Sequence, residues 1–446
     1  MFPGVFTPDS FFTIKQARSQ IPLDDFHTIT YTLVVKMLTL NGTYLWILTA
    51  LQIALNIIAL WFVIRSLKLF KSRSQELTTT SVLFCLPFFG PFSATFWKDS
   101  LYNPLVVIGL IGILKNCLRT NAVNTFDRKK KIVIFFYSSL LTLGSLLRHE
   151  GFVILASFAI LLFVLSMILK QFRNLRLASC SFFACSLSCI LLSTLMINVT
   201  DAKKVPSYQR TVSFLLDLQY VNATRPDLLE SKTKSILDQI STDKSLSGAA
   251  NCSGPFGFWD FGFNEQQANL RSSEIPLLWL KTARSDARET MFEGRFCRLK
   301  SIMPPIFSNT PTQGYWPTTG IGFNELGIDH GTIGNTFYPA GYSWSYLWRN
   351  NGNFVAWPGL HLGLIFLLII FNSRVREVYR RNHVIFIGVI SFVLLRFLAL
   401  SITVASQEYR YYYLVYLVSM PLLTLAIYDS LNSKKAKLRN VGPKDV

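Results

Sequence analysis

The chain has 446 residues, 50% of them hydrophobic, and a mean hydropathy of +0.35. This composition is too apolar for a soluble protein of this size and indicates a membrane protein. The formal net charge of +19 would suit a nucleic-acid binder, but the basic residues flank apolar runs, so membrane topology explains them better and no nucleic-acid partner is expected.

Residues 1–43 precede the first long apolar run and are predicted to form an outward loop. Within it, FHTITYTLVVKML is predicted to be a juxtamembrane helix lying along the membrane surface. The loop also carries several ionisable residues near its start and middle: Asp9, Asp24, Asp25 and His27. Nine spans behind an outward N-terminus are unusual, so we expect that a first helix is missing from this sequence.

Apolar runs of about 17 to 23 residues then recur, the length that a helix needs to cross roughly 30 Å of hydrocarbon. Nine spans are predicted: 44–64, 81–97, 102–118, 132–147, 152–169, 177–197, 355–371, 384–403 and 411–428. The first six form a bundle over 44–198 and the last three lie within 354–430. Several of the runs contain proline, so tilted or broken helices are expected.

Basic residues gather in every second loop. They follow the first, third, fifth, seventh and ninth runs, for example Lys68, Lys130, Arg173 and Arg380, and they fill the tail 431–446. By the positive-inside rule these loops and the tail are cytoplasmic. The remaining loops, including LRHEG at 147–151, then share the opposite membrane face.

The long segment 199–353 is predicted to be an extracytoplasmic domain of α+β or irregular structure. It carries fifteen Lys and Arg against fourteen Asp and Glu, so it is nearly neutral. Its second half is rich in Gly and aromatic residues, which suits sugar binding and an interfacial aromatic belt equally well. Cys252 and Cys297 are the two cysteines of this segment, and an isolated pair in an oxidising compartment predicts a disulfide.

Charged residues of several outward turns are expected near one membrane face. For any one of them, a solvated turn residue paired with a neighbour is the simpler interpretation. Arg396 lies inside the eighth run, where an arginine costs roughly 2.5–3.5 kcal/mol, so it should face a cavity or a partner. Basic groups at this depth suit a lipid-borne phosphate, and a nearby carboxylate suits general-base catalysis. The cations are Lys98, Arg148, Arg396 and Arg410, and the carboxylates are Asp9, Asp99, Glu150 and Glu408.

Five short motifs carry a resemblance to a known class. PGVFTPDS, DDFHTITYTLV, WKDSLY, RHEG and EYRYY occur in this order. The chain thereby resembles the GT-C class of polytopic membrane glycosyltransferases and is similar to the bacterial serotype-converting O-antigen glucosyltransferases. The resemblance covers most of residues 1–151 and the last three apolar runs, and it does not extend to 199–353.

The resemblance implies an all-α polytopic enzyme that moves a sugar from a polyprenyl-phosphate donor to an acceptor glycan, lipid or protein, with inversion at the anomeric carbon. In that class an acid of the first outward loop is the catalytic base, which corresponds to Asp9, with Asp24 and Asp25 as rivals. Lys98, Arg148, Arg396 and Arg410 would stabilise the leaving phosphate. The residues that would bind the acceptor or orient the site are Asp24, Asp25, His27, Asp99, His149, Glu150 and Glu408.

The expected location is the bacterial inner membrane with the site facing the periplasm or exterior, or the ER membrane. No metal-ligand spacing is visible and no cofactor is expected, although the resemblance leaves a divalent cation open. The alternative function is a transporter or flippase of a lipid-linked substrate. Transporters tend to show repeated halves and ionisable groups at the bilayer midplane, and the sequence shows neither repeat halves nor a midplane acid.

Overall fold

The computed structural model describes residues 6–86, 89–118, 128–168, 175–242, 262–299, 326, 328, 358–403 and 413–440. These residues form helices, and the only β pairing among them is two isolated bridges. The predicted all-α class is therefore confirmed for this part of the chain. The described residues of 199–353 also form helices; the prediction of α+β or irregular structure for this segment is untested in its remaining residues, which lie outside the described part of the chain.

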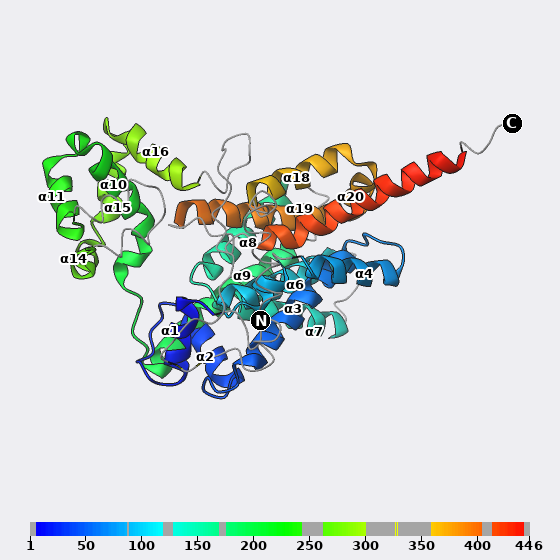
Figure 1. Cartoon of the computed structure of the whole chain (residues 1–446), viewed down its shortest axis with the longest axis horizontal. Coiled ribbons are helices and arrows are strands. Elements are labelled where there is room, and N and C mark those ends of the chain that lie inside the picture. The colour runs from blue at the N-terminus through cyan, green and yellow to red at the C-terminus, as the bar shows by residue number, and fades with distance from the viewer. Residues whose placement is uncertain are drawn as a thin grey trace.

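A bundle of long helices makes up the body of the molecule (Figure 1). Its helices are α3 (Leu45–Ser66), α4 (Arg73–Phe84), α6 (Lys98–Leu118), α7 (Arg128–Leu146), α8 (Gly151–Ile168), α9 (Leu175–Thr200), α18 (Pro358–Phe371), α19 (Ser373–Thr403) and α20 (Tyr413–Asn440). Three shorter helices accompany them: α1 (Pro8–Ala17), α2 (Ile29–Leu38) and α5 (Gly90–Ala94).

Six of these helices are long and apolar enough to cross a membrane. They are Leu45–Ser66, Lys98–Cys117, Gly151–Ile168, Leu175–Thr200, Ser373–Ala399 and Tyr413–Asn432. Their outer surfaces expose large apolar side chains such as Ile160, Leu191 and Val199. Water would penalise such a surface, whereas lipid would not. The chain is thus a multi-pass membrane protein.

The predicted span 81–97 is wrong. Helix α4 ends at Phe84, and only the five-residue α5 follows before α6 begins at Lys98. Pro87 and Pro91 lie in this stretch. Proline has no backbone N–H to donate to the preceding helical turn, and its ring clashes with a carbonyl of that turn. Phe96 and Trp97, at the end of this stretch, are buried in the core of the bundle.

Helix α6 occupies the centre of the bundle and packs against α3, α7 and α19. Gly109 and Gly112 bring α7 close: a Cβ on Gly112 would lie 2.2 Å from the ring of Tyr137, and one on Gly109 would lie 2.7 Å from Leu141. Small residues allow such close approach of membrane helices, where dispersion contacts replace the hydrophobic effect. Helix α6 is therefore a fixed frame for the residues at its start.

A separate group of helices follows α9 and has its own apolar core. It comprises η2 (Ser207–Arg210), α10 (Val212–Thr224), η3 (Pro226–Leu228), α11 (Ser231–Ile240), α14 (Glu265–Arg271), α15 (Ile275–Thr282) and α16 (Arg288–Leu299). We call this group the helical domain. Inside it the buried carboxylate of Asp217 binds Arg295 and Arg298 and accepts a hydrogen bond from Trp279 Nε1 at 2.7 Å.

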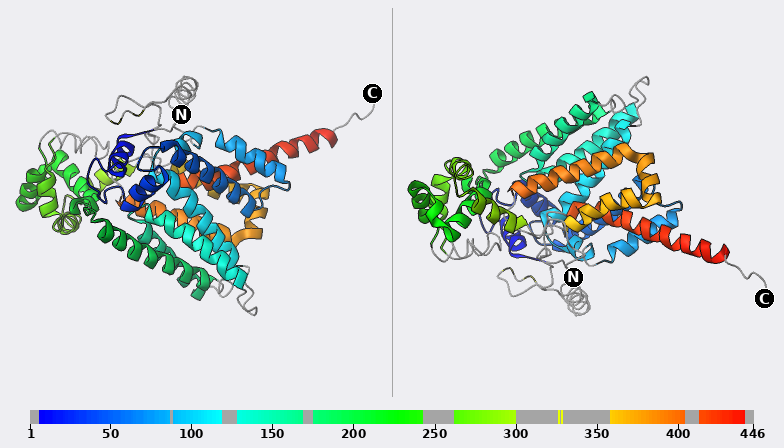
Figure 2. Two further views of the ribbon diagram at one scale, coloured as in Figure 1. Left: turned by 90° about the horizontal axis from the view of Figure 1, so that it is seen from below. Right: turned by 90° about the horizontal axis from the view of Figure 1, so that it is seen from above.

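The helical domain lies at one end of the bundle, next to α1 and α2 (Figure 2). At the opposite end lie the junction between α18 and α19 and the far half of α20. The bundle therefore has two distinct ends, and the basic residues of that junction, such as Arg374 and Arg380, lie away from the domain.

Candidate functional site

Helix α1 is fastened to the residues just before α6 by two hydrogen bonds. The Thr7 hydroxyl caps α1 by accepting from the backbone of Ser10 and also accepts from Trp97 Nε1 at 2.8 Å. The Ser10 hydroxyl donates to the Phe96 carbonyl at 2.8 Å. These bonds join the TPDS and FWKDS motifs and hold Asp9, in the first turn of α1, beside Lys98.

Asp9 and Lys98 line one small cavity. Its other lining residues include His27, Tyr31 and Asp99. The cavity volume is about 20 Å³, which is room for roughly one water molecule. Asp9 Oδ1 lies 3.8 Å from His27 Nε2, and the Asp9 side chain is 40% exposed. The Asp9 carboxylate thus borders both the solvent and the cavity.

The RHEG turn joins the same cluster from the end of α7. Arg148 is 7% exposed and forms ion pairs with Asp99 and Glu150. A Cβ on Gly151 would lie 2.1 Å from the Ser145 carbonyl oxygen, so only glycine permits this tight turn. The turn therefore fixes a guanidinium between two carboxylates that come from α6 and from the turn itself.

Glu150 carries its negative charge over the whole physiological range. Burial raises the pKa of its carboxyl, but Arg148, the Glu150 backbone amide, Arg396 and Lys98 together lower that pKa to about 2. The carboxylate and the guanidinium are both charged, and Arg148 is largely neutralised by its two acidic partners.

Arg396 of α19 is the last member of the cluster. Its guanidinium lies 4.3 Å from the centre of the Tyr102 ring, and its Nη1 donates to Asn103 Oδ1 at 2.8 Å. The same ring lies 5.7 Å from the guanidinium of Arg148. Arg396 is 2% exposed, and its Nε and Nη2 have no hydrogen-bond partner among the described residues. Unpaired donors at such depth are costly and indicate a missing acceptor.

The acids at 24 and 25 serve local structure. Asp24 Oδ1 accepts from the Phe26 amide at 3.0 Å, and the buried Asp25 accepts from the Ile29 amide at the start of α2 at 2.7 Å. His149 lies 3.3 Å from the Phe26 carbonyl and 3.7 Å from Asp25. This network ties the loop before α2 to the RHEG turn, and neither Asp24 nor Asp25 lines the cavity.

The structure thus brings together most of the residues predicted for the site. Asp9, His27, Lys98 and Asp99 share the cavity, while Arg148, Glu150 and Arg396 join it through ion pairs or the Tyr102 ring. Arg410, Glu408 and Cys252 lie outside the described residues. Cys297 is disulfide-bonded, whereas the cysteines at 85, 117, 180, 185 and 189 are free thiols.

Three side chains of the cluster were not among the predicted site residues. Tyr102 and Asn103 lie one helical turn after Lys98 and Asp99, so helical spacing would have placed them on the same face. Trp97, which binds Thr7, is the residue directly before Lys98. Helical spacing could have shown that these residues lie near Lys98 and Asp99. It could not have shown that Tyr102 and Asn103 contact Arg396 or that Trp97 binds Thr7.

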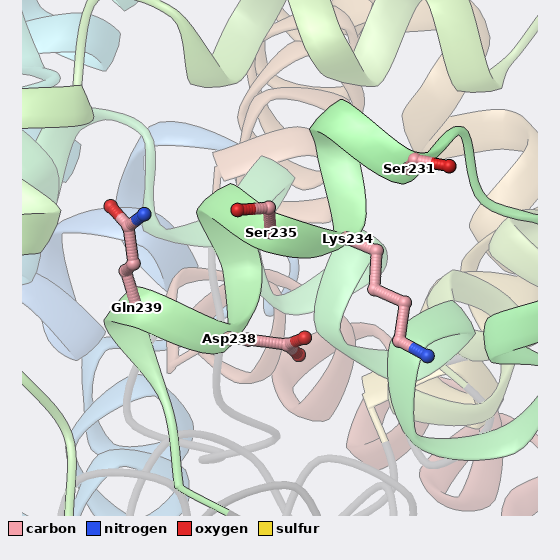
Figure 3. Close-up of a pocket in the computed structure, with 5 residues that line it drawn as sticks. All are labelled: Ser231, Lys234, Ser235, Asp238 and Gln239. Atoms are coloured by element: carbon pink, nitrogen blue, oxygen red, sulfur yellow. The ribbon is translucent and has the colours of Figure 1, made fainter.

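Two further observations limit what the described part of the chain offers as a site. It contains no group of three or more His, Cys, Asp or Glu that could hold a metal ion. A shallow depression on α11 is lined by Ser231, Lys234, Ser235, Asp238 and Gln239 (Figure 3). All five lie on one exposed helix, so nothing encloses a ligand there.

No protein-family model, curated protein or solved structure matches this chain. The function therefore has to be argued from the cluster itself.

Proposed function

We propose that the protein is an inverting glycosyltransferase of the GT-C type that uses a polyprenyl-phosphate-linked sugar as donor. The observation that carries this proposal is the shared cluster: an accessible carboxylate, Asp9, lies beside a cavity whose walls connect to the buried cations Arg148 and Arg396. A base and a phosphate-stabilising group at one membrane end are what sugar transfer from a lipid phosphate requires.

Asp9 acts as the base. Its carboxylate is partly exposed, so an acceptor hydroxyl can reach it, and α1 is held rigidly by Thr7 and Ser10. It takes the proton of the acceptor hydroxyl as that oxygen attacks the anomeric carbon. His27, 3.8 Å away, orients the carboxylate.

Arg396 and Lys98 stabilise the phosphate that departs. Arg396 offers two buried N–H donors with no acceptor in the described part of the chain, so a phosphate oxygen would satisfy them without breaking another bond. Donors already in place stabilise the growing negative charge more than the ground state. Arg148 is held by Asp99 and Glu150 and so positions Asp99 and the Tyr102 ring.

The end of the bundle that bears the cluster faces outward in this proposal. The α18–α19 junction and the basic part of α20 lie at the other end (Figure 2), which the positive-inside rule makes cytoplasmic. The helical domain then stands beside the site on the outer face, and α10 contacts α19.

Two matched variants test the base. Asp9→Asn keeps the shape of the side chain and is expected to lower transfer of labelled sugar from a polyprenyl-phosphate donor by about 100-fold or more, the typical contribution of a general base. Asp24→Asn changes a half-buried acid of the same loop that does not line the cavity and should keep transfer within about threefold, because the asparagine Oδ1 can still accept the hydrogen bond from the Phe26 amide. Near-normal turnover by Asp9→Asn would overturn the assignment.

A further inference from the structure

A long groove runs along the membrane-facing surface between α7 and α9. Its volume is about 570 Å³, and its lining includes Lys131, Ser139 and Leu143 of α7 and Ser181 and Ala184 of α9. From Lys131 to Leu146 the groove spans 15 residues of α7, or about 22 Å at 1.5 Å per residue. That exceeds the roughly 15 Å thickness of one leaflet's hydrocarbon.

The groove suits a hydrocarbon chain. Serine, threonine and alanine are among its lining residues. Two of the hydroxyls are satisfied by their own helices: Ser139 donates to the Phe135 carbonyl and Ser181 to the Leu177 carbonyl, each at 3.0 Å. These side chains therefore offer no free donor to a polar ligand. Leu143 and Phe135 are exposed beside them, so the walls are apolar.

One end of the groove is basic. Lys131 is its only charged lining residue in the described part of the chain, and Arg128, Lys129 and Lys130 directly precede it at the start of α7. The start of α7 also carries the positive end of the helix dipole. A negatively charged headgroup would therefore be attracted to this end and would leave its chain in the groove.

The groove does not lead to the candidate functional site. Tyr137 and Leu141 turn toward α6, where they meet Gly112 and Gly109, and Arg148 lies on that same side of α7, where it binds Asp99. Ser139 and Leu143 lie on a different face of the helix. A donor phosphate bound by the site could not place its chain here without passing around α7.

We infer that the groove between α7 and α9 is a binding site for an anionic phospholipid of the leaflet at the basic end, with its headgroup at Lys131 and one acyl chain along Ser139 and Ala184. The charge of Lys131 favours an anionic headgroup over a zwitterionic one. The position of the groove, on a face of α7 other than the one that meets α6 and the site, favours a phospholipid over the polyprenyl donor. The site is independent of the proposed transferase activity.

The purified full chain in detergent tests this inference by native mass spectrometry with phosphatidylglycerol, phosphatidylcholine and polyprenyl phosphate as the added lipids. Wild type is expected to retain phosphatidylglycerol in preference to phosphatidylcholine. Lys131→Gln should lower that preference about fivefold, the equivalent of the roughly 1 kcal/mol that a basic residue contributes near an anionic leaflet. Ala184→Phe should remove lipid of every headgroup from the groove.

Two control variants keep the experiment specific. Arg380→Gln removes an exposed charge of α19 and Ile160→Trp enlarges an exposed side chain of α8, and neither residue lines the groove, so both should retain wild-type lipid. Equal retention of phosphatidylcholine, preferential retention of polyprenyl phosphate, or unchanged binding in Lys131→Gln and Ala184→Phe would each overturn the inference. A melting temperature equal to wild type shows that a variant is folded, and Ser139→Phe replaces Ala184→Phe if that variant fails to fold.

Discussion

Replacing Arg148 by methionine should destabilise the protein strongly, because it removes the cation between two carboxylates. Arg148 is 7% exposed and Asp99 is 1% exposed, so water cannot replace the lost partner of Asp99. Removal of one member of a buried ion pair costs about 3 to 5 kcal/mol. We expect a loss of this size in the free energy of unfolding for Arg148→Met.

The assay is equilibrium unfolding in mixed detergent micelles, arranged as a double-mutant cycle. The double variant Arg148→Met with Asp99→Asn removes both charges and should be more stable than Arg148→Met alone, which identifies the unpaired carboxylate as the cause. If Arg148→Met unfolds within about 0.5 kcal/mol of wild type, as exposed substitutions do, the cluster is solvated and our reasoning about the site is wrong.

Three further predictions concern pH, packing and the helical domain. The folded pKa of Glu150 is about 2 against an ordinary 4.5, so its stabilisation is complete above pH 4.5 and is lost as pH falls toward 2; Glu150→Gln should flatten the stability profile over that range. Gly112→Ala places a Cβ 2.2 Å from the Tyr137 ring and should cost about 1 to 3 kcal/mol of unfolding free energy, whereas Gly363→Ala, with nothing within 4 Å, should be neutral. Asp217→Asn leaves two arginines without their shared carboxylate and should make the helical domain sensitive to limited trypsin digestion, while wild type stays intact.

Local sequence properties accounted for most of the helices. Runs such as 44–64 and 177–197 coincide with α3 and α9, because a continuous apolar stretch long enough to span can hardly do otherwise. The predicted span 81–97 failed because its prolines were expected to tilt or break a helix that still spans, whereas α4 ends at Phe84 and only the short α5 follows before α6. Helix α20 extends to Asn440 through residues that were expected to be a tail, since lysine and leucine are good helix formers whatever their surroundings.

The candidate site was only partly predictable. Alternation of basic loops placed Asp9, Lys98 and Arg148 on one face, but it could not show which of them touch. The pairing of Arg396 with the Tyr102 ring joins α19 to α6, and such contacts depend on how distant helices pack. For the same reason the sequence could not show that Asp24 and Asp25 accept hydrogen bonds from local amides.

The most direct test of the proposed function is a reaction with purified wild-type protein in vesicles that contain a polyprenyl-phosphate sugar and a soluble acceptor glycan. If the protein is an inverting glycosyltransferase, the lipid-linked sugar is consumed. Nuclear magnetic resonance then finds a new glycosidic bond whose anomeric configuration is opposite to that of the donor. A sugar lipid that stays chemically intact while it crosses the bilayer would contradict the account and identify a flippase instead.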